Sequence, residues 1–240
     1  MTLVKVSTRQ VAVAGLLGAL TIALGLTPLG FVPVPTPAGS ATTMHIPAII
    51  AGVVEGPAVG AAVGVIFGSF SFYRAQTQAN PVARMMFTDP LIAFLPRILI
   101  GVVAWTVFWF CQRGATVTTG RGARSLFAAA FGGVVAHTCY QAMFRYEMLD
   151  GAAALGVGLA TGAVVAAVVW KVLSVRAGAV GLAALAGSLT NTVGVLGLSV
   201  LRGYIPAPAA LAVGVLHGIP EMLVASVLAV LVYRGLAKRA

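Results

Sequence analysis

Long apolar runs separated by short polar breaks extend along the whole sequence. Most of the runs reach the roughly 20 mostly apolar residues that a membrane-spanning helix needs. A break at Glu55-Gly56-Pro57 divides one run into two short helices joined by a tight turn. The pattern predicts about eight helices, at residues 9–27, 44–54, 57–72, 90–111, 125–144, 152–173, 178–201 and 208–234.

The composition indicates that these helices lie in lipid. Of the 240 residues, 60% are hydrophobic and only 8% are charged, whereas about a quarter of the residues of a soluble domain are charged. A chain this apolar cannot cover a water-facing surface, so we predict an all-α, polytopic membrane protein. No polar stretch is long enough for a separate soluble domain, and residues 1–240 are expected to form a single transmembrane domain.

The basic residues predict how the helices are oriented. The net charge is +10, but the cations lie at the ends of apolar runs and not on one element with aromatic residues, which excludes a nucleic-acid platform. Because cytoplasmic loops carry an excess of Lys and Arg, we predict that both termini lie on the cytoplasmic side of the cell membrane. The Glu55-Gly56-Pro57 turn either reaches the inner side, as eight crossings require, or dips partway into the membrane and re-enters. Ten cations then fall inside (Lys5, Arg9, Arg113, Arg121, Arg124, Lys171, Arg176, Arg234, Lys238 and Arg239) and five outside (Arg74, Arg84, Arg97, Arg145 and Arg202).

Ionisable residues inside the apolar runs are candidate functional residues. Arg97 lies eight residues after Asp89, the predicted helix cap, which places it about 12 Å below the cap. Pro96 should bend that helix and free a carbonyl group. His217 and Glu221 are four residues apart on the last helix and share one face. A metal site there is not expected, because no third ligand accompanies the pair.

Two further polar residues interrupt apolar runs. Asn191 places an amide in an apolar helix, and His45 opens the second helix at the expected rim of an outer vestibule. Each candidate also has a structural explanation: Asn191 as an interhelical hydrogen bond, His45 as an interfacial histidine, and Arg97 as an arginine that extends to the membrane surface. The functional hypothesis is a cavity in the outer half, beneath loops 28–43 and 73–88. The side chains expected to point towards it are Arg97, Asn191, His217 and Glu221.

Small residues form a stripe on the first predicted helix. Ala14 and Gly18, and likewise Gly15 and Ala19, are separated by four residues. Such a flat surface suits close packing of another helix, which either belongs to this chain or to a partner protein.

Sequence motifs of enzymes are missing. The chain has no nucleophile elbow, no zinc-protease motif and no P-loop. We therefore expect no enzymatic activity and no cofactor, and the chain cannot hydrolyse ATP by itself.

The motifs of residues 26–72 resemble those of substrate-binding S components of energy-coupling factor (ECF) vitamin transporters, closest to the pantothenate and folate types. The resemblance continues in order through "FLPRILIGVV" (94–103), "GSLTNTVGVLG" (187–197) and "GIPEMLVASVLAVLVY" (218–233), over about 170 residues. The matching pieces of the first segment are Pro28-Leu29-Gly30, His45-Ile46-Pro47 and Glu55-Gly56-Pro57 followed by Gly60 and Gly64. This chain departs from the family by about 55 extra residues, 121–177, which are predicted to form an inserted helical hairpin beside a six-helix core.

The resemblance implies a vitamin-binding subunit with both termini in the cytoplasm. Such a subunit binds its vitamin at the outer face and associates with a transmembrane coupling subunit and two cytoplasmic ATPases. In that family, small residues on the first helix contact the coupling subunit. They map here onto Ala14, Gly15, Gly18 and Ala19.

Charge on the outer side indicates the class of substrate. Arg84 and Arg97 are the outer cations expected to lack an acidic partner near the cavity, and an arginine fork holds a carboxylate through two hydrogen bonds. We therefore expect a small anion such as pantothenate. Two alternatives stay open: a cationic or neutral vitamin held by Glu221, and a stand-alone, proton-coupled secondary transporter with Glu221 or His217 in the proton relay.

Overall fold

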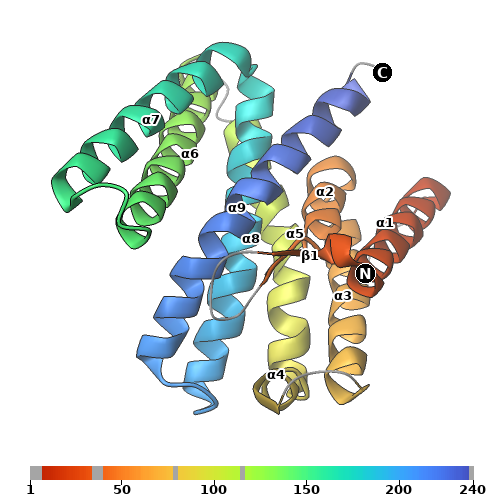
Figure 1. The fold of residues 1–240 in the computed structure, drawn as a ribbon. Coiled ribbons are helices and arrows are strands. Elements are labelled where there is room, and N and C mark those ends of the chain that lie inside the picture. The colour runs from red at the N-terminus through yellow and green to blue at the C-terminus, as the bar shows by residue number, and fades with distance from the viewer. Residues whose placement is uncertain (1–6, 34–39, 78–80, 114–116, 238–240) are drawn as a thin grey trace. The chain divides into compact units, whose positions relative to one another are not determined.

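The computed structural model describes residues 7–33, 40–77, 81–113 and 117–237, and α-helices dominate them (Figure 1). Seven of these helices are long and apolar enough to cross a membrane, and α2 is a shorter apolar helix. The predicted all-α, polytopic fold is thus confirmed. The elements are α1 (Thr8–Leu26), η1 (Pro28–Gly30), β1 (Phe31–Pro33), β2 (Ser40–Thr42), α2 (Ile46–Glu55), α3 (Pro57–Thr77), α4 (Pro81–Phe87), α5 (Pro90–Arg113), α6 (Val117–Arg145), α7 (Gly151–Val172), α8 (Val175–Leu201) and α9 (Ala207–Ala237).

The structure differs from the predicted helices in several places; α6, for example, begins at Val117 and not at residue 125. The helix after the Gly56 turn is not short, because α3 continues for 21 residues to Thr77. The polar stretch 73–88 is not a plain loop, since it contains the end of α3 and the short helix α4. Pro81 opens α4 at the first helical position, where proline loses no hydrogen bond. With seven residues, α4 is too short to cross a membrane.

The chain divides into two compact units. The first contains Met1–Phe108 and Ala183–Ala229, and the second contains Trp109–Leu182 and Val230–Ala240. In the second unit α6 and α7 lie side by side (Figure 1). Glycines bring the two helices close together: a Cβ atom added to Gly132 would lie 2.5 Å from the carbonyl oxygen of Gly162, and the reverse substitution gives the same distance.

The turn between α2 and α3 lies beside the first residues of α1. Gly56 makes this turn with φ 100°, a conformation that favours glycine. Arg9 forms an ion pair of 2.7 Å with Glu55, so the turn and the start of α1 share one end of the first unit. Because α2 has ten residues, it is about 15 Å long. His45 at its start therefore lies about halfway across a hydrocarbon core of ~30 Å.

Three glycines allow the backbones of α2, α3 and α5 to touch in the first unit. A Cβ atom on Gly52 would lie 2.2 Å from the Gly101 carbonyl oxygen, and one on Gly101 would lie 2.5 Å from the Gly60 Cα atom. Backbone atoms cannot move aside as a flexible side chain can. This contact therefore fixes the position of α2, which carries His45 at its start.

Gly101→Ala should therefore destabilise the protein, because overpacking of a close helix contact costs about 1–3 kcal/mol. Gly197→Ala is the matched control, since a Cβ atom on Gly197 meets no atom within 4 Å. Thermal unfolding of the two purified variants in detergent measures the difference. Equal unfolding temperatures for both variants would contradict the prediction.

Candidate functional site

A group of polar side chains is buried inside the first unit. They come from the start of α2 and from α5, α8 and α9, and each exposes 7% or less of its surface. Burial of polar groups in a membrane protein is costly, so such groups are normally paired or functional. The five residues of this buried polar cluster are His45, Arg97, Asn191, His217 and Glu221.

Arg97 is held inside α5 by a local consequence of Pro96. Proline has no N–H group, which leaves the carbonyl of Ile92 without its helical partner. The Nη1 atom of Arg97 donates to this carbonyl oxygen at 2.8 Å. The guanidinium also lies over the rings of Phe67 and Phe87, at 5.3 and 4.8 Å. Arg97 thus turns into the protein and does not extend to the membrane surface.

The packing of α8 places Asn191 opposite Arg97. A Cβ atom on Gly194 would lie 2.9 Å from the Pro96 side chain, and Gly187 similarly contacts α2 and α5. Asn191 lies between these two glycines at helical spacing, so it shares their face of α8. This face meets α5 in the segment that contains Arg97.

Glu221 connects α9 to the strand segment before α2. Its Oε1 atom accepts a hydrogen bond from the backbone N–H of Thr42 at 2.7 Å, and Oε2 accepts one from the Thr192 hydroxyl at 3.4 Å. Arg97 and Glu221 do not form an ion pair with each other. Ion pairs that the structure does contain join Arg9 to Glu55 and Arg202 to Asp89. Glu221 therefore does not neutralise Arg97 by direct contact.

Several polar atoms of this cluster, and the hydroxyl of the buried Ser188 three residues before Asn191 on α8, have no hydrogen-bond partner among the described residues. They are both ring nitrogens of His45, Nε of Arg97, Oγ of Ser188 and Oδ1 of Asn191. The imidazole of His45, when neutral, offers one donor and one acceptor. Buried polar groups are rarely left without partners, and these atoms are available to bind a polar ligand.

Two candidate residues, His45 and Arg84, do not lie where the sequence predicted them. His45 is fully buried and not at a rim, because the short α2 begins deep in the unit. Arg84 is exposed on α4, whereas Arg97 lies in the cluster. Of the loops expected above the cavity, residues 34–39 and 78–80 lie outside the described residues.

Asp89 and Arg202, which were both predicted on the outer side, are engaged with each other. Asp89 caps α5, as predicted, by accepting a hydrogen bond from the Leu91 N–H at 2.9 Å. Its other oxygen pairs with Arg202 at 3.1 Å and accepts a hydrogen bond from the Tyr204 hydroxyl at 3.4 Å. Among the described cations that were predicted on the outer side, Arg97 is the one that lies inside the polar cluster.

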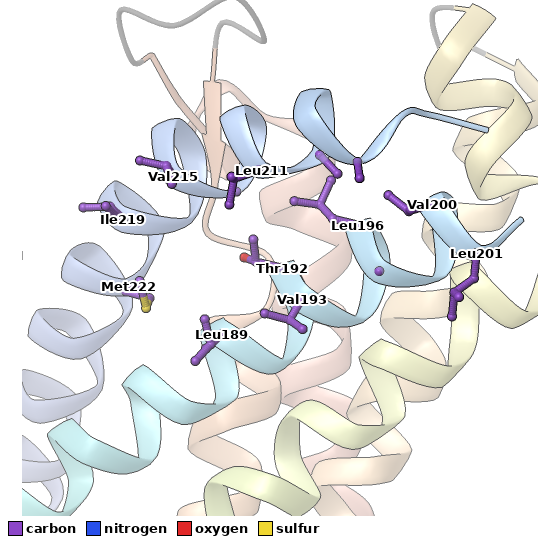
Figure 2. Close-up of a pocket in the computed structure, with 14 residues that line it drawn as sticks. Leu189, Thr192, Val193, Leu196, Val200, Leu201, Leu211, Val215, Ile219 and Met222 are labelled. Carbon is purple, nitrogen blue, oxygen red and sulfur yellow. The ribbon is translucent and has the colours of Figure 1, made fainter. Parts of the chain in front are cut away.

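An apolar groove of about 630 Å³ lies between α8 and α9 of the first unit (Figure 2). Thr192 is its polar lining residue, and the others, such as Leu196 and Leu211, are apolar. Thr192 also bonds Glu221, so the groove and the buried polar cluster meet at this residue. The groove lining carries no charge and cannot hold a carboxylate by itself.

The small-residue stripe of α1 does not lie on a single exposed face. Gly18 is buried, and a Cβ atom there would lie 2.4 Å from the Ile66 side chain of α3. Ala14 is half-buried, while Gly15 and Ala19 are exposed, and nothing lies within 4 Å of a Cβ atom on Gly15. The stripe thus serves packing inside the unit at Gly18 and leaves an open surface at Gly15 and Ala19.

Comparison with known proteins gives two matches. Residues 9–233 match a family described as ECF transporter, substrate-specific component. A stretch of 85 residues is 32% identical to the pantothenate transporter PanT of Leuconostoc mesenteroides. This second match covers 35% of the chain and 40% of the relative, so the chain aligns with less than half of that transporter.

Proposed function

Because the chain belongs to the family of ECF transporter substrate-specific components, we propose that it captures a small, water-soluble vitamin at the outer face of the cell membrane. The vitamin is a carboxylate, with pantothenate the best candidate. Import is driven by ATP through a transmembrane coupling subunit and two cytoplasmic ATPases. The chain itself binds the substrate and performs no chemical reaction.

Arg97 is the observation that supports a carboxylate substrate. Arg97 is 4% exposed. Its guanidinium is not in ion-pair contact with Glu221 or any other described carboxylate, and its Nε atom has no hydrogen-bond partner among the described residues. A carboxylate of the substrate would neutralise this charge through a two-bond fork. In a site shielded from water such a pair is stronger than at the surface.

The neutral polar atoms around Arg97 suit the rest of such a molecule. His45, Ser188 and Asn191 present acceptors and donors without partners among the described residues, and these complement hydroxyl and amide groups. Glu221 has a different role in this proposal. By holding the N–H of Thr42, it fixes the end of β2 against α9 on one side of the site.

Uptake of labelled pantothenate should require a coupling subunit and its two ATPases. We expect cells that express this chain alone to accumulate no more label than empty cells, and cells with the complete module to concentrate it. Uptake should persist when an uncoupler removes the proton gradient while ATP is maintained. Uptake by the chain alone that stops with the uncoupler would instead establish the proton-coupled transporter, with Glu221 or His217 as the relay.

A further inference from the structure

Acidic and basic side chains lie at opposite ends of the α6–α7 hairpin. Glu147 and Asp150, the two acidic residues of the second unit, belong to the turn between the helices. At the other end of the hairpin, about 33 Å away along α7, its described residues hold no carboxylate. This basic end is formed by Arg121 and Arg124 of α6, Lys171 of α7 and Arg176 of α8.

Two contacts join the helix ends that carry these cations. The Nε1 atom of Trp170, beside Lys171, donates to the Ser125 hydroxyl of α6 at 3.1 Å. A Cβ atom added to Gly178 of α8 would lie 2.8 Å from the Cα atom of Arg124. The starts of α6 and α8 and the end of α7 therefore meet around Arg124.

The side chain of Arg124 has the geometry of a binding residue. Its guanidinium carbon lies 4.3 Å from the centre of the Trp170 ring. The Nε atom is buried and has no hydrogen-bond partner among the described residues. The excess of cations on cytoplasmic loops explains the sign of the charge here, but it does not explain a guanidinium stacked on an indole with a buried donor left over.

The end of α7 lies at the level of the lipid headgroups. The segment Gly151–Val172 is long and apolar enough to cross a membrane, so its end reaches the membrane surface. Trp170 is 44% exposed, and tryptophan is enriched at the level of lipid headgroups. An anionic phospholipid presents its phosphate group at this level, beside Trp170 and the cations.

We propose that the basic end of the hairpin binds the phosphate headgroup of an anionic phospholipid, with Arg124 and Trp170 as the central contacts. Basic clusters at the ends of spanning helices attract anionic lipids, and arginine is well suited to phosphate oxygens. This inference does not depend on the vitamin or on the coupling mechanism.

The test uses the full-length protein in a neutral detergent. Phosphatidylglycerol added to the micelles should raise the unfolding temperature and stay bound in native mass spectrometry, while phosphatidylcholine should do neither. Combined Arg121→Gln and Arg176→Gln substitutions, at exposed positions, should weaken phosphatidylglycerol binding about 25-fold, or about fivefold for each charge. Arg124→Gln should weaken it further.

Arg84→Gln is the matched control, because it removes an exposed cation of α4 in the first unit; its lipid affinity should equal that of the unchanged protein. Inorganic phosphate and glycerol phosphate should produce no shift in unfolding temperature. A shift equal to that of the lipid would overturn the proposal in favour of a soluble-anion site. Unchanged lipid affinity in the double variant would also overturn the proposal. If the double variant keeps its lipid affinity but loses a co-purifying acidic subunit, the cations belong to a protein interface.

Discussion

Arg97→Ala should weaken binding of pantothenate at least about 30-fold, because truncation of one partner of a buried, hydrogen-bonded charge pair costs ~2–5 kcal/mol. Isothermal titration calorimetry of the purified protein measures the effect directly. Arg97→Lys keeps the charge but loses the planar fork, so its affinity should lie between those of the alanine variant and the unchanged protein.

Arg84→Ala is the control for this experiment. Arg84 is also a cation of the outer region, but it is exposed on α4, where solvent screens its charge. Its loss should leave the affinity unchanged. The same titration with folate, niacin, biotin and thiamine tests the substrate class. Tight thiamine binding without a response to any carboxylate, or carboxylate binding unaffected by Arg97→Ala, would count against an anionic substrate.

The local features of this fold could be predicted from the sequence because they depend on neighbours along the chain. The apolar runs predicted the long helices, Asp89 predicted a helix cap, and Gly56 predicted a turn. Pro96 predicted a freed carbonyl group. This is the carbonyl of Ile92, and it accepts a hydrogen bond from Arg97, five residues further along the helix. In each case the hydrogen bonds involved are fixed by helical geometry alone.

The contacts that build the site across the chain could not be predicted in the same way. Thr42 binds Glu221 across 179 positions through its backbone N–H, and a backbone donor leaves no mark in a residue pattern. The depth of His45 depends on the early end of α2. Phe87 reaches Arg97 because α4 forms where polarity indicated a loop. The position of Ser188 could have been predicted from the sequence, because it lies three residues before Asn191 and therefore on the same face of α8.

The exposed part of the α1 stripe is the place where a partner helix is expected. Gly15 has open space around its Cα atom, and Ala19 is exposed one helical turn further. Small residues let two helices approach closely in lipid. Helix docking onto this surface would be blocked by a large side chain, while the buried polar cluster on α2, α5, α8 and α9 would not be altered.

Gly15→Trp or Ala19→Trp should accordingly abolish transport and leave vitamin binding to the isolated protein intact. Co-purification with the coupling subunit, uptake and calorimetry on the same variants separate the two properties. Ala209→Trp, at an exposed alanine of α9, controls for the added bulk and should retain transport. Gly18→Trp should instead lower the unfolding temperature, because its side chain would displace Ile66. If Gly15→Trp loses vitamin binding as well, the stripe serves the fold of this chain and not a partner.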